Sequence, residues 1–498
     1  SNTRPAADDA SDAASGDDGA NGAREAPGDV GRGGADGDHA RANDPDANQD
    51  GPLSALRSNP TVRSMVTVTF GREAFMQRLH ADGLAHVVDT YRMFDAAMHV
   101  DEHGGLTPTD AAFNLRDARF SPLGAQEEPE FSDTRFDGAV ARVLGADRAS
   151  DLSIQRVDLL QRAVSDFHII AAEPGTASAD KAQRAMGIID AIGDPELTEF
   201  APQVGSALIN GGDTPEFDFP LAGRLDAARL KARDLLFSGQ LDQAIEPIEA
   251  ALTRFDQRFS NIPGVPRYFN SYAERVIYNR LFATPGEQTV LIPDNLFYAH
   301  MELSDVLAQL KGAKRALPHL NALVSYAPAY PLSHMKLAVQ LAREEDWDSA
   351  RAACLNALRV SLDRNDASYA YYRFAYAAWM RDELDVAAAA YMMSDHIASG
   401  QIAALEGELH ELVARAQSQC VRIPGTIEEA QAVLRERNLP VWPHTEAAGI
   451  VRDAARVCVD HGMFVPARTL SVAAARMNDS ADGGIDIAQA QFLRSLNT

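Results

Sequence analysis

The chain has 498 residues, 46% of them hydrophobic, and its 46 basic against 71 acidic residues leave a formal charge of −25. Because phosphate contacts need a concentrated basic surface, this balance argues against a nucleic-acid-binding protein. No uncharged apolar run approaches the roughly 18 residues of a membrane-spanning helix, so no membrane span is expected. The three cysteines are too few for a disulfide framework.

The first predicted segment is a disordered acidic tail over residues 1–55. Residues 1–50 contain twelve carboxylates and four arginines, so they carry −8 of the charge and the other 448 residues carry −17. These fifty residues are rich in Asp, Ala, Gly and Asn, and Val30 is their only branched aliphatic residue. Such a segment cannot bury enough apolar surface to offset its chain entropy. It is either a tolerated terminus, which we favour, or a flexible spacer.

The compartment is predicted from the cysteines and the N-terminus. Cys354, Cys420 and Cys458 are expected to be reduced thiols, which favours the cytoplasm. The tail has no apolar signal-peptide core. The chain starts at Ser1-Asn2 without Met, as a processed or recombinant end does, so a removed export or anchor segment stays an open alternative.

Residues 56–221 are expected to form a helical N-terminal region. Apolar residues recur there at helical spacing, and glycines or prolines end each run. The predicted helical segments are 75–98, 152–167, 178–192 and 196–210. The stretch 213–221 (DTPEFDFPL) is predicted to be a linker. The region shows no resemblance to a particular family.

Residues 222–498 carry an internal repeat. Ala316 and Leu320 recur 34 residues later as Ala350 and Cys354. A further copy at Ala387 is displaced by 37 residues, and a turn between the helices can absorb the extra three. Other copies lie at 232–251 and 454–474.

This pattern resembles the tetratricopeptide repeat, a pair of antiparallel helices with a 34-residue period. Small residues such as Ala338 stand where neighbouring helices approach closely, and Trp347 stands where a large residue fills the space between pairs. Pro328 matches the proline at the end of the second helix, whereas His300 and His334 replace the tryptophan of the motif. The resemblance implies an all-α fold, an α-solenoid with an additional helical region before it.

Two gaps between copies are long enough for further repeats. They run from Ala244 to Ala316 (72 residues) and from Ala387 to Ala467 (80 residues). Each gap would fit one degenerate helix pair. The sequence therefore predicts five to seven helix pairs at a period of about 34 residues.

The resemblance places a peptide-binding groove on the first helix of each pair. Carried over residue by residue, its lining is Tyr298, Met301, Asp305, Met335, Val339, Arg343, Tyr369, Tyr372, Tyr376 and Trp379. An aromatic and methionine-rich lining suits an apolar helix or an extended segment. Met301 and Asp305 occupy sites of the family's carboxylate clamp, so we expect no clamp. The alternative is that the stripe from Tyr369 to Trp379 packs against a neighbouring helix, as aromatic stripes at helical spacing commonly do.

One motif suggests metal chemistry. The run from His99 to His103 fits H-x-x-E-H, the zinc signature of inverted-motif metallopeptidases. On a helix, His99 and His103 would share one face, with Glu102 as a base and Glu173 as a more distant ligand. However, Gly104-Gly105 ends such a helix directly after His103, where a ligand should be held rigidly. We therefore interpret the motif as a solvated helix end.

The sequence predicts a non-enzymatic interaction protein, without a cofactor, whose groove binds a protein or peptide partner. Two alternatives stay open. One is a metal-dependent hydrolase using His99, Glu102 and His103. The other is a structural or regulatory protein whose groove is filled by its own N-terminal helices.

Overall fold

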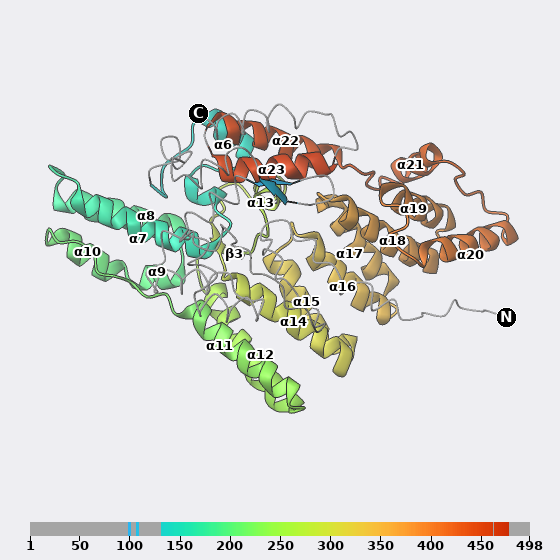
Figure 1. Ribbon diagram of the computed structural model, residues 1–498, viewed down its shortest axis with the longest axis horizontal. Coiled ribbons are helices and arrows are strands. Elements are labelled where there is room, and N and C mark those ends of the chain that lie inside the picture. The colour runs from blue at the N-terminus through green and yellow to red at the C-terminus, as the bar shows by residue number, and fades with distance from the viewer. Residues whose placement is uncertain (1–97, 101–105, 109–130, 462, 478–498) are drawn as a thin grey trace, which may run out of the picture. The chain divides into compact units, whose positions relative to one another are not determined.

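The computed structural model describes residues 98–100, 106–108, 131–461 and 463–477, and these are mostly α-helical (Figure 1). The helical prediction is therefore confirmed for the described part of the chain. Short strands accompany the helices: β1 (Met98–Val100) pairs antiparallel with β2 (Leu106–Pro108), and β3 (Val265–Arg267) lies parallel to β4 (Thr289–Leu291). The predicted tail, 1–55, and residues 75–97 of the predicted helical segment 75–98 lie outside the described residues, and the last residue of that segment, Met98, begins a strand.

In the described N-terminal region, the predicted segments 152–167, 178–192 and 196–210 are largely helical, as α7 (Arg156–Ala172), α8 (Ser178–Ile192), α9 (Pro195–Glu199) and α10 (Ala201–Ile209). The helix α6 (Gly138–Leu144) and the 3-10 turn η2 (Ala149–Leu152) were not predicted. Gly193 ends α8 in the left-handed conformation, which glycine adopts without steric cost. Asp194 then caps α9 by accepting the backbone N–H groups of Glu196 and Leu197. The predicted helix 196–210 is therefore present in two parts, divided at Phe200.

Helices continue to the end of the described chain. They are α11 (Leu221–Phe237), α12 (Leu241–Ser260), α13 (Tyr272–Leu281), α14 (Asp294–Leu310), α15 (Ala313–Tyr326), α16 (Pro331–Arg343), α17 (Trp347–Val360), α18 (Arg364–Met380), α19 (Leu384–Ile397), α20 (Leu405–Ser418), α21 (Ile427–Glu436), α22 (Thr445–Asp460) and α23 (Phe464–Met477). Each of the predicted repeat copies corresponds to one pair of these helices: α11–α12, α14–α15, α16–α17, α18–α19 and α22–α23.

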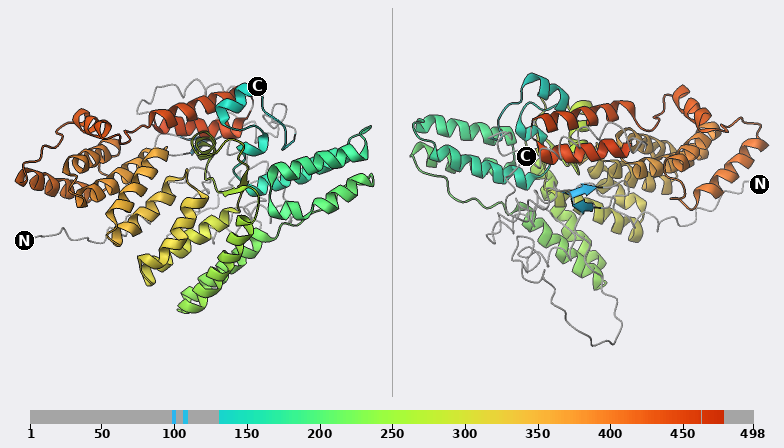
Figure 2. Two further views of the ribbon diagram at one scale, coloured as in Figure 1. Left: turned by 180° about the vertical axis from the view of Figure 1, so that it is seen from behind. Right: turned by 45° about the horizontal axis from the view of Figure 1, so that its top comes forward.

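Helices α14 to α19 pack as consecutive pairs. The two helices of each pair contact each other, and the second helix of one pair contacts the first helix of the next. The first helices α16 and α18 also touch, and α11 and α12 both pack against α14. Figure 2 shows these helices side by side, in yellow to orange, from two further directions. The described chain therefore contains sequential helix pairs in nearest-neighbour contact.

Small residues on the second helices allow this close packing. Ala316 of α15, Ala350 of α17 and Ala387 of α19 are the residues by which the repeat was recognised, and all three are buried. A larger side chain at these positions would hold the neighbouring helix away, because interiors are close-packed. The small residues therefore recur in the sequence at the positions where neighbouring helices approach each other.

The first long gap between copies does not form a helix pair. It holds β3, α13 and β4, in which Val265 pairs with Thr289 and Arg267 with Leu291. Proline 266 and the β-branched residues around Val290 favour extended backbone over helix. Gly264 allows the two segments to approach, since a Cβ there would lie 2.5 Å from Val290 Cγ2. The expectation of a degenerate repeat in this gap is wrong.

The second long gap is helical, and the pair after it has unexpected neighbours. Both α20 and α21 pack against α19. The last pair, α22–α23, instead contacts α13, and α22 also contacts α6 of the N-terminal region. The chain therefore brings its last described helices back to segments far earlier in the sequence.

The predicted linker at 213–221 is part of the packed structure. Phe217 packs against Phe200 with ring centroids 4.6 Å apart, and edge-on against Phe167 at 6.5 Å. Phe219 also packs edge-on against Phe200. The two phenylalanines within DTPEFDFPL therefore pack against α7 and against the residue that follows α9. The prolines and acidic residues of this stretch suggest a linker instead.

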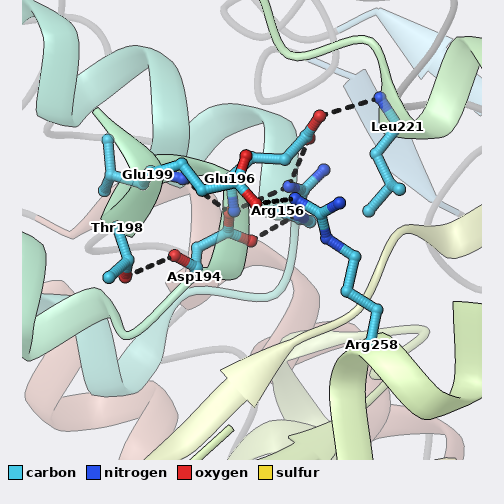
Figure 3. A network of polar contacts seen from close by, with 8 residues as sticks. Arg156, Asp194, Glu196, Thr198, Glu199, Leu221 and Arg258 are labelled. Carbon is cyan, nitrogen blue, oxygen red and sulfur yellow. Dashed lines mark hydrogen bonds and ion pairs between the residues drawn. The ribbon is translucent and has the colours of Figure 1, made fainter. Parts of the chain in front are cut away.

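A buried ion cluster joins this region to α11 (Figure 3). The Arg156 side chain donates to Asp194, with Nε 2.5 Å from Oδ2, and to Glu196, with Nη2 2.7 Å from Oε2. The second oxygen of Glu196 accepts the backbone N–H of Leu221 at the start of α11. Burial raises the pKa of Glu196, although the Arg156 charge opposes that rise. The arginine thus holds two carboxylates at the junction of α7, α9 and α11.

Arg156→Leu is expected to lower the free energy of unfolding by about 3–5 kcal/mol, because it leaves two buried carboxylates without their counter-charge. Urea unfolding followed by far-UV circular dichroism measures the loss. The matched control is Arg258→Ala, which breaks an ion pair with the exposed Glu199 and should cost less than about 1 kcal/mol. Equal losses in the two variants would contradict this role for Arg156.

Candidate interaction surface on the first helices

The predicted groove residues lie on α14, α16 and α18, the first helices of three consecutive pairs. Met335, Tyr372 and Trp379 are buried, with relative exposures of 4%, 4% and 3%. Tyr298, Met301, Tyr369 and Tyr376 are partly exposed, and Arg343 is exposed. The single stripe expected from the spacing is thus divided between an inner and an outer set.

Tyr372 is held by a carboxylate from helix α20, which follows the α18–α19 pair in the chain. Its hydroxyl donates to Glu408 Oε1 on α20 at 2.7 Å, and Tyr391 of α19 donates to Glu408 Oε2 at 2.5 Å. Burial raises the pKa of both tyrosines, and the Glu408 charge raises it further. One carboxylate therefore joins α18, α19 and α20.

Trp379 belongs to an edge-to-face series of rings. Its ring centroid lies 6.2 Å from that of Tyr376. The Tyr376 centroid in turn lies 5.7 Å from that of Trp347 at the start of α17. Aromatic rings prefer this arrangement, and their burial contributes to helix packing. Trp379 therefore positions the partly exposed ring of Tyr376.

Tyr369 and Tyr376 present partly exposed aromatic surface on α18. The guanidinium of Arg373, one turn from Tyr369, lies 5.7 Å from the centre of that ring. On α16, Lys336 binds Asp305 of α14 at 2.8 Å. The outer set therefore combines aromatic rings with cationic groups, on a chain whose formal charge is −25.

Tyr298 has a packing role on α14. Its hydroxyl lies 3.2 Å from that of Tyr268, which stacks on Phe297 with ring centroids 4.3 Å apart. Tyr330, before α16, closes the cluster against Phe297. The cluster fixes α14 against the segment after β3.

Several buried polar groups were not predicted from the sequence. Arg229 of α11 donates to Asp226 at 2.8 Å and to Glu302 of α14 at 2.6 Å. Asn295 of α14 donates to the same Asp226 oxygen at 3.0 Å. These partners are up to 73 residues apart in the chain, so no local motif marks them. A second group, around His300 and His319, is described below.

The metal motif does not have the expected local structure. His99 lies in strand β1, so the helix that would place His99 and His103 on one face is absent at that end. Glu102 and His103 lie outside the described residues. Glu173 accepts hydrogen bonds from Thr176 and Arg184. In the described part of the chain, no three His, Cys, Asp or Glu side chains form a group that could hold a metal ion.

Cys354 and Cys458, on α17 and α22, are buried small side chains. Burial raises the pKa of the Cys354 and Cys458 thiols to about 12, which suppresses the thiolate form at neutral pH. Cys420 is exposed.

The chain matches no protein-family model and no curated protein sequence. None of the helices within the described ranges is both long and apolar enough to cross a membrane.

Glu408→Ala is expected to lower the free energy of unfolding by about 2–4 kcal/mol, because two largely buried tyrosine hydroxyls lose a charged acceptor. Chemical denaturation compares it with Glu406→Ala, an exposed position on the same helix that should change stability by less than about 0.5 kcal/mol. A loss no greater than that of the control would show that Glu408 does not join the helices.

Proposed function

We propose that this chain is a tetratricopeptide-like α-solenoid that binds a peptide or protein segment on its first helices. The binding surface would run over α14, α16 and α18. Its exposed contacts would be Tyr369, Tyr376, Met301 and Arg343, while Met335, Tyr372 and Trp379 position them from beneath.

The order of the helix contacts is the observation that carries this proposal. In α14 to α19 the most extensive contacts of each pair are with its sequence neighbours along the array, and this is how solenoids of helix pairs are built. The 34-residue spacing of Ala316 and Ala350 supports the same architecture. A stack of this kind aligns its first helices on one side, where successive repeats can contact an extended ligand.

The chemistry of the outer set indicates the kind of ligand. Aromatic and methionine side chains give large contact area and adapt to apolar partners. Arg343 and Arg373 add guanidinium groups, which bind carboxylates and stack on aromatic rings. The surface therefore suits a segment with apolar or aromatic anchors and a nearby acidic group.

Covering of this surface by the N-terminal region is the competing proposal. The main contacts of α18 are with α16, α17 and α19. The described helices from α7 to α10 mainly contact one another, and α6 contacts α13 and α22. In the described part of the chain, these contacts favour a surface open to a separate partner.

Selection of a random peptide-display library on the full chain tests the proposal. A selected peptide should bind in fluorescence anisotropy, and Tyr369→Ala/Tyr376→Ala should weaken its Kd at least about tenfold, since aromatic anchors carry much of the binding energy. Ile209→Ala is the control, because it removes an exposed apolar side chain from α10. An unchanged Kd in the folded double variant, or selection of no peptide by the wild type, would overturn the proposal.

A further inference from the structure

A row of hydrogen-bonded polar side chains crosses the interface of α12, α14 and α15. His300 of α14 faces His319 of α15, with their Nδ1 atoms 3.0 Å apart. The Nε2 atom of His300 lies 3.1 Å from Asp256 Oδ1 on α12. The Nε2 atom of His319 lies 3.4 Å from Glu249 Oε1 on the same helix. The two imidazoles therefore link two carboxylates of one helix.

Further hydrogen-bond donors hold the carboxylates at both ends of this row. Tyr326 donates to Asp256 Oδ1 at 2.5 Å, and Arg315 Nη2 donates to Glu249 Oε2 at 2.8 Å. The imidazoles are withdrawn from water, with relative exposures of 2% for His300 and 8% for His319. Protein groups are therefore the main partners of all four ring nitrogens.

The charged groups of the other helices packed against α14 and α15 bind elsewhere. Arg229 of α11 pairs with Asp226 and Glu302, Lys336 of α16 pairs with Asp305, and the ring of His334 of α16 hydrogen-bonds to the Pro328 carbonyl. The groups facing the two rings are thus Asp256, Glu249, Arg315 and Tyr326.

Proton counting then restricts the state of the pair. A carboxylate only accepts, so each of the two outer contacts requires a proton on Nε2. The contact between the two Nδ1 atoms requires one proton and cannot hold two, because two N–H groups would face each other at 3.0 Å. All three contacts are made only with three protons on four nitrogens. Two neutral imidazoles carry two protons, and two imidazolium ions carry four.

We propose that His300 and His319 share a single excess proton, and that this proton joins α12 to the α14–α15 pair. The device is a pH-sensitive joint between the first helix pair and the rest of the array. It is independent of peptide binding on the outer surface.

The surroundings indicate where the proton resides. Burial and the charge on His300 lower the pKa of His319, which favours a neutral His319 ring. His300 then donates from Nε2 to Asp256 and from Nδ1 to His319. His319 donates from Nε2 to Glu249. The positive charge lies next to the two hydrogen bonds of Asp256.

The contribution of the shared proton to the free energy of unfolding is greatest at one pH and falls on either side of it. Above about pH 7 the unfolded chain holds two neutral imidazoles, so the folded chain binds one more proton and loses stability as the pH rises. Below about pH 6 both unfolded imidazoles are charged, so the folded chain binds one proton fewer and loses stability as the pH falls. The contribution is therefore greatest near the ordinary histidine pKa of about 6.5.

Ring-nitrogen NMR of the full chain labelled with ¹⁵N-histidine tests the shared proton directly. At about pH 7.5, one unit above the ordinary pKa, exposed histidines are mostly neutral. We expect one imidazolium to persist in the folded wild type, with both nitrogens protonated, and to disappear on addition of urea. Spectra in which every ring is neutral at this pH would overturn the proposal.

A pH series of unfolding measurements tests the joint. The unfolding equilibrium constant of the wild type, divided by that of His300→Gln/His319→Gln, should rise about tenfold per pH unit above the maximum and rise again below it. His410→Gln, at an exposed position on α20, should retain the maximum. A ratio that does not vary between about pH 5.5 and 8.5 would overturn the proposal. If the double variant does not fold, the NMR result on the wild type decides.

Discussion

The contact between one helix pair and the next is the interaction on which the described structure depends. A single pair of amphipathic helices leaves an apolar face uncovered, and only a neighbouring pair can bury it. The approach is possible because Ala316, Ala350 and Ala387 are small where the helices meet. The partly exposed aromatic residues of α18 keep their positions only because this stacking supports α18 from both sides.

Polar contacts between packed helices fix how each helix is aligned along its neighbour. Apolar contacts are non-directional, so a stack held by them alone could shift by a helical turn at modest cost. Such a shift of about 5.4 Å would separate Arg229 from Glu302, or Glu408 from Tyr372, and leave buried groups without partners. The first of these contacts connects two helix pairs, and the second connects the α18–α19 pair to the following helix α20. The polar contacts thus select one alignment among those that hydrophobic burial permits.

The repeat could be predicted from the sequence because small residues recur at a fixed spacing that helical geometry explains. The β3–α13–β4 segment could not, since strands of three residues are too short to show an alternating pattern. The first-helix location of Tyr372 and Trp379 followed from the resemblance to the tetratricopeptide repeat, but their burial depends on neighbours such as Glu408 and Tyr376. The partners of His300 lie 19 and 44 residues away, and nothing local to either histidine identifies them. Periodicity locates elements, whereas polar pairing across elements is a property of the packed structure.

The formal charge of −25 has different consequences at different distances. At physiological salt the Debye length is about 8 Å, so most of that charge would not act on a segment bound at the proposed surface of α16 and α18. Charged groups on or packed against these helices include Arg343, Arg373 and the paired Lys336 and Asp305. An acidic segment at the proposed surface would be attracted at short range by the guanidinium groups of Arg343 and Arg373. For the proposed binding surface, local charge on the first helices therefore matters more than the net charge of the protein.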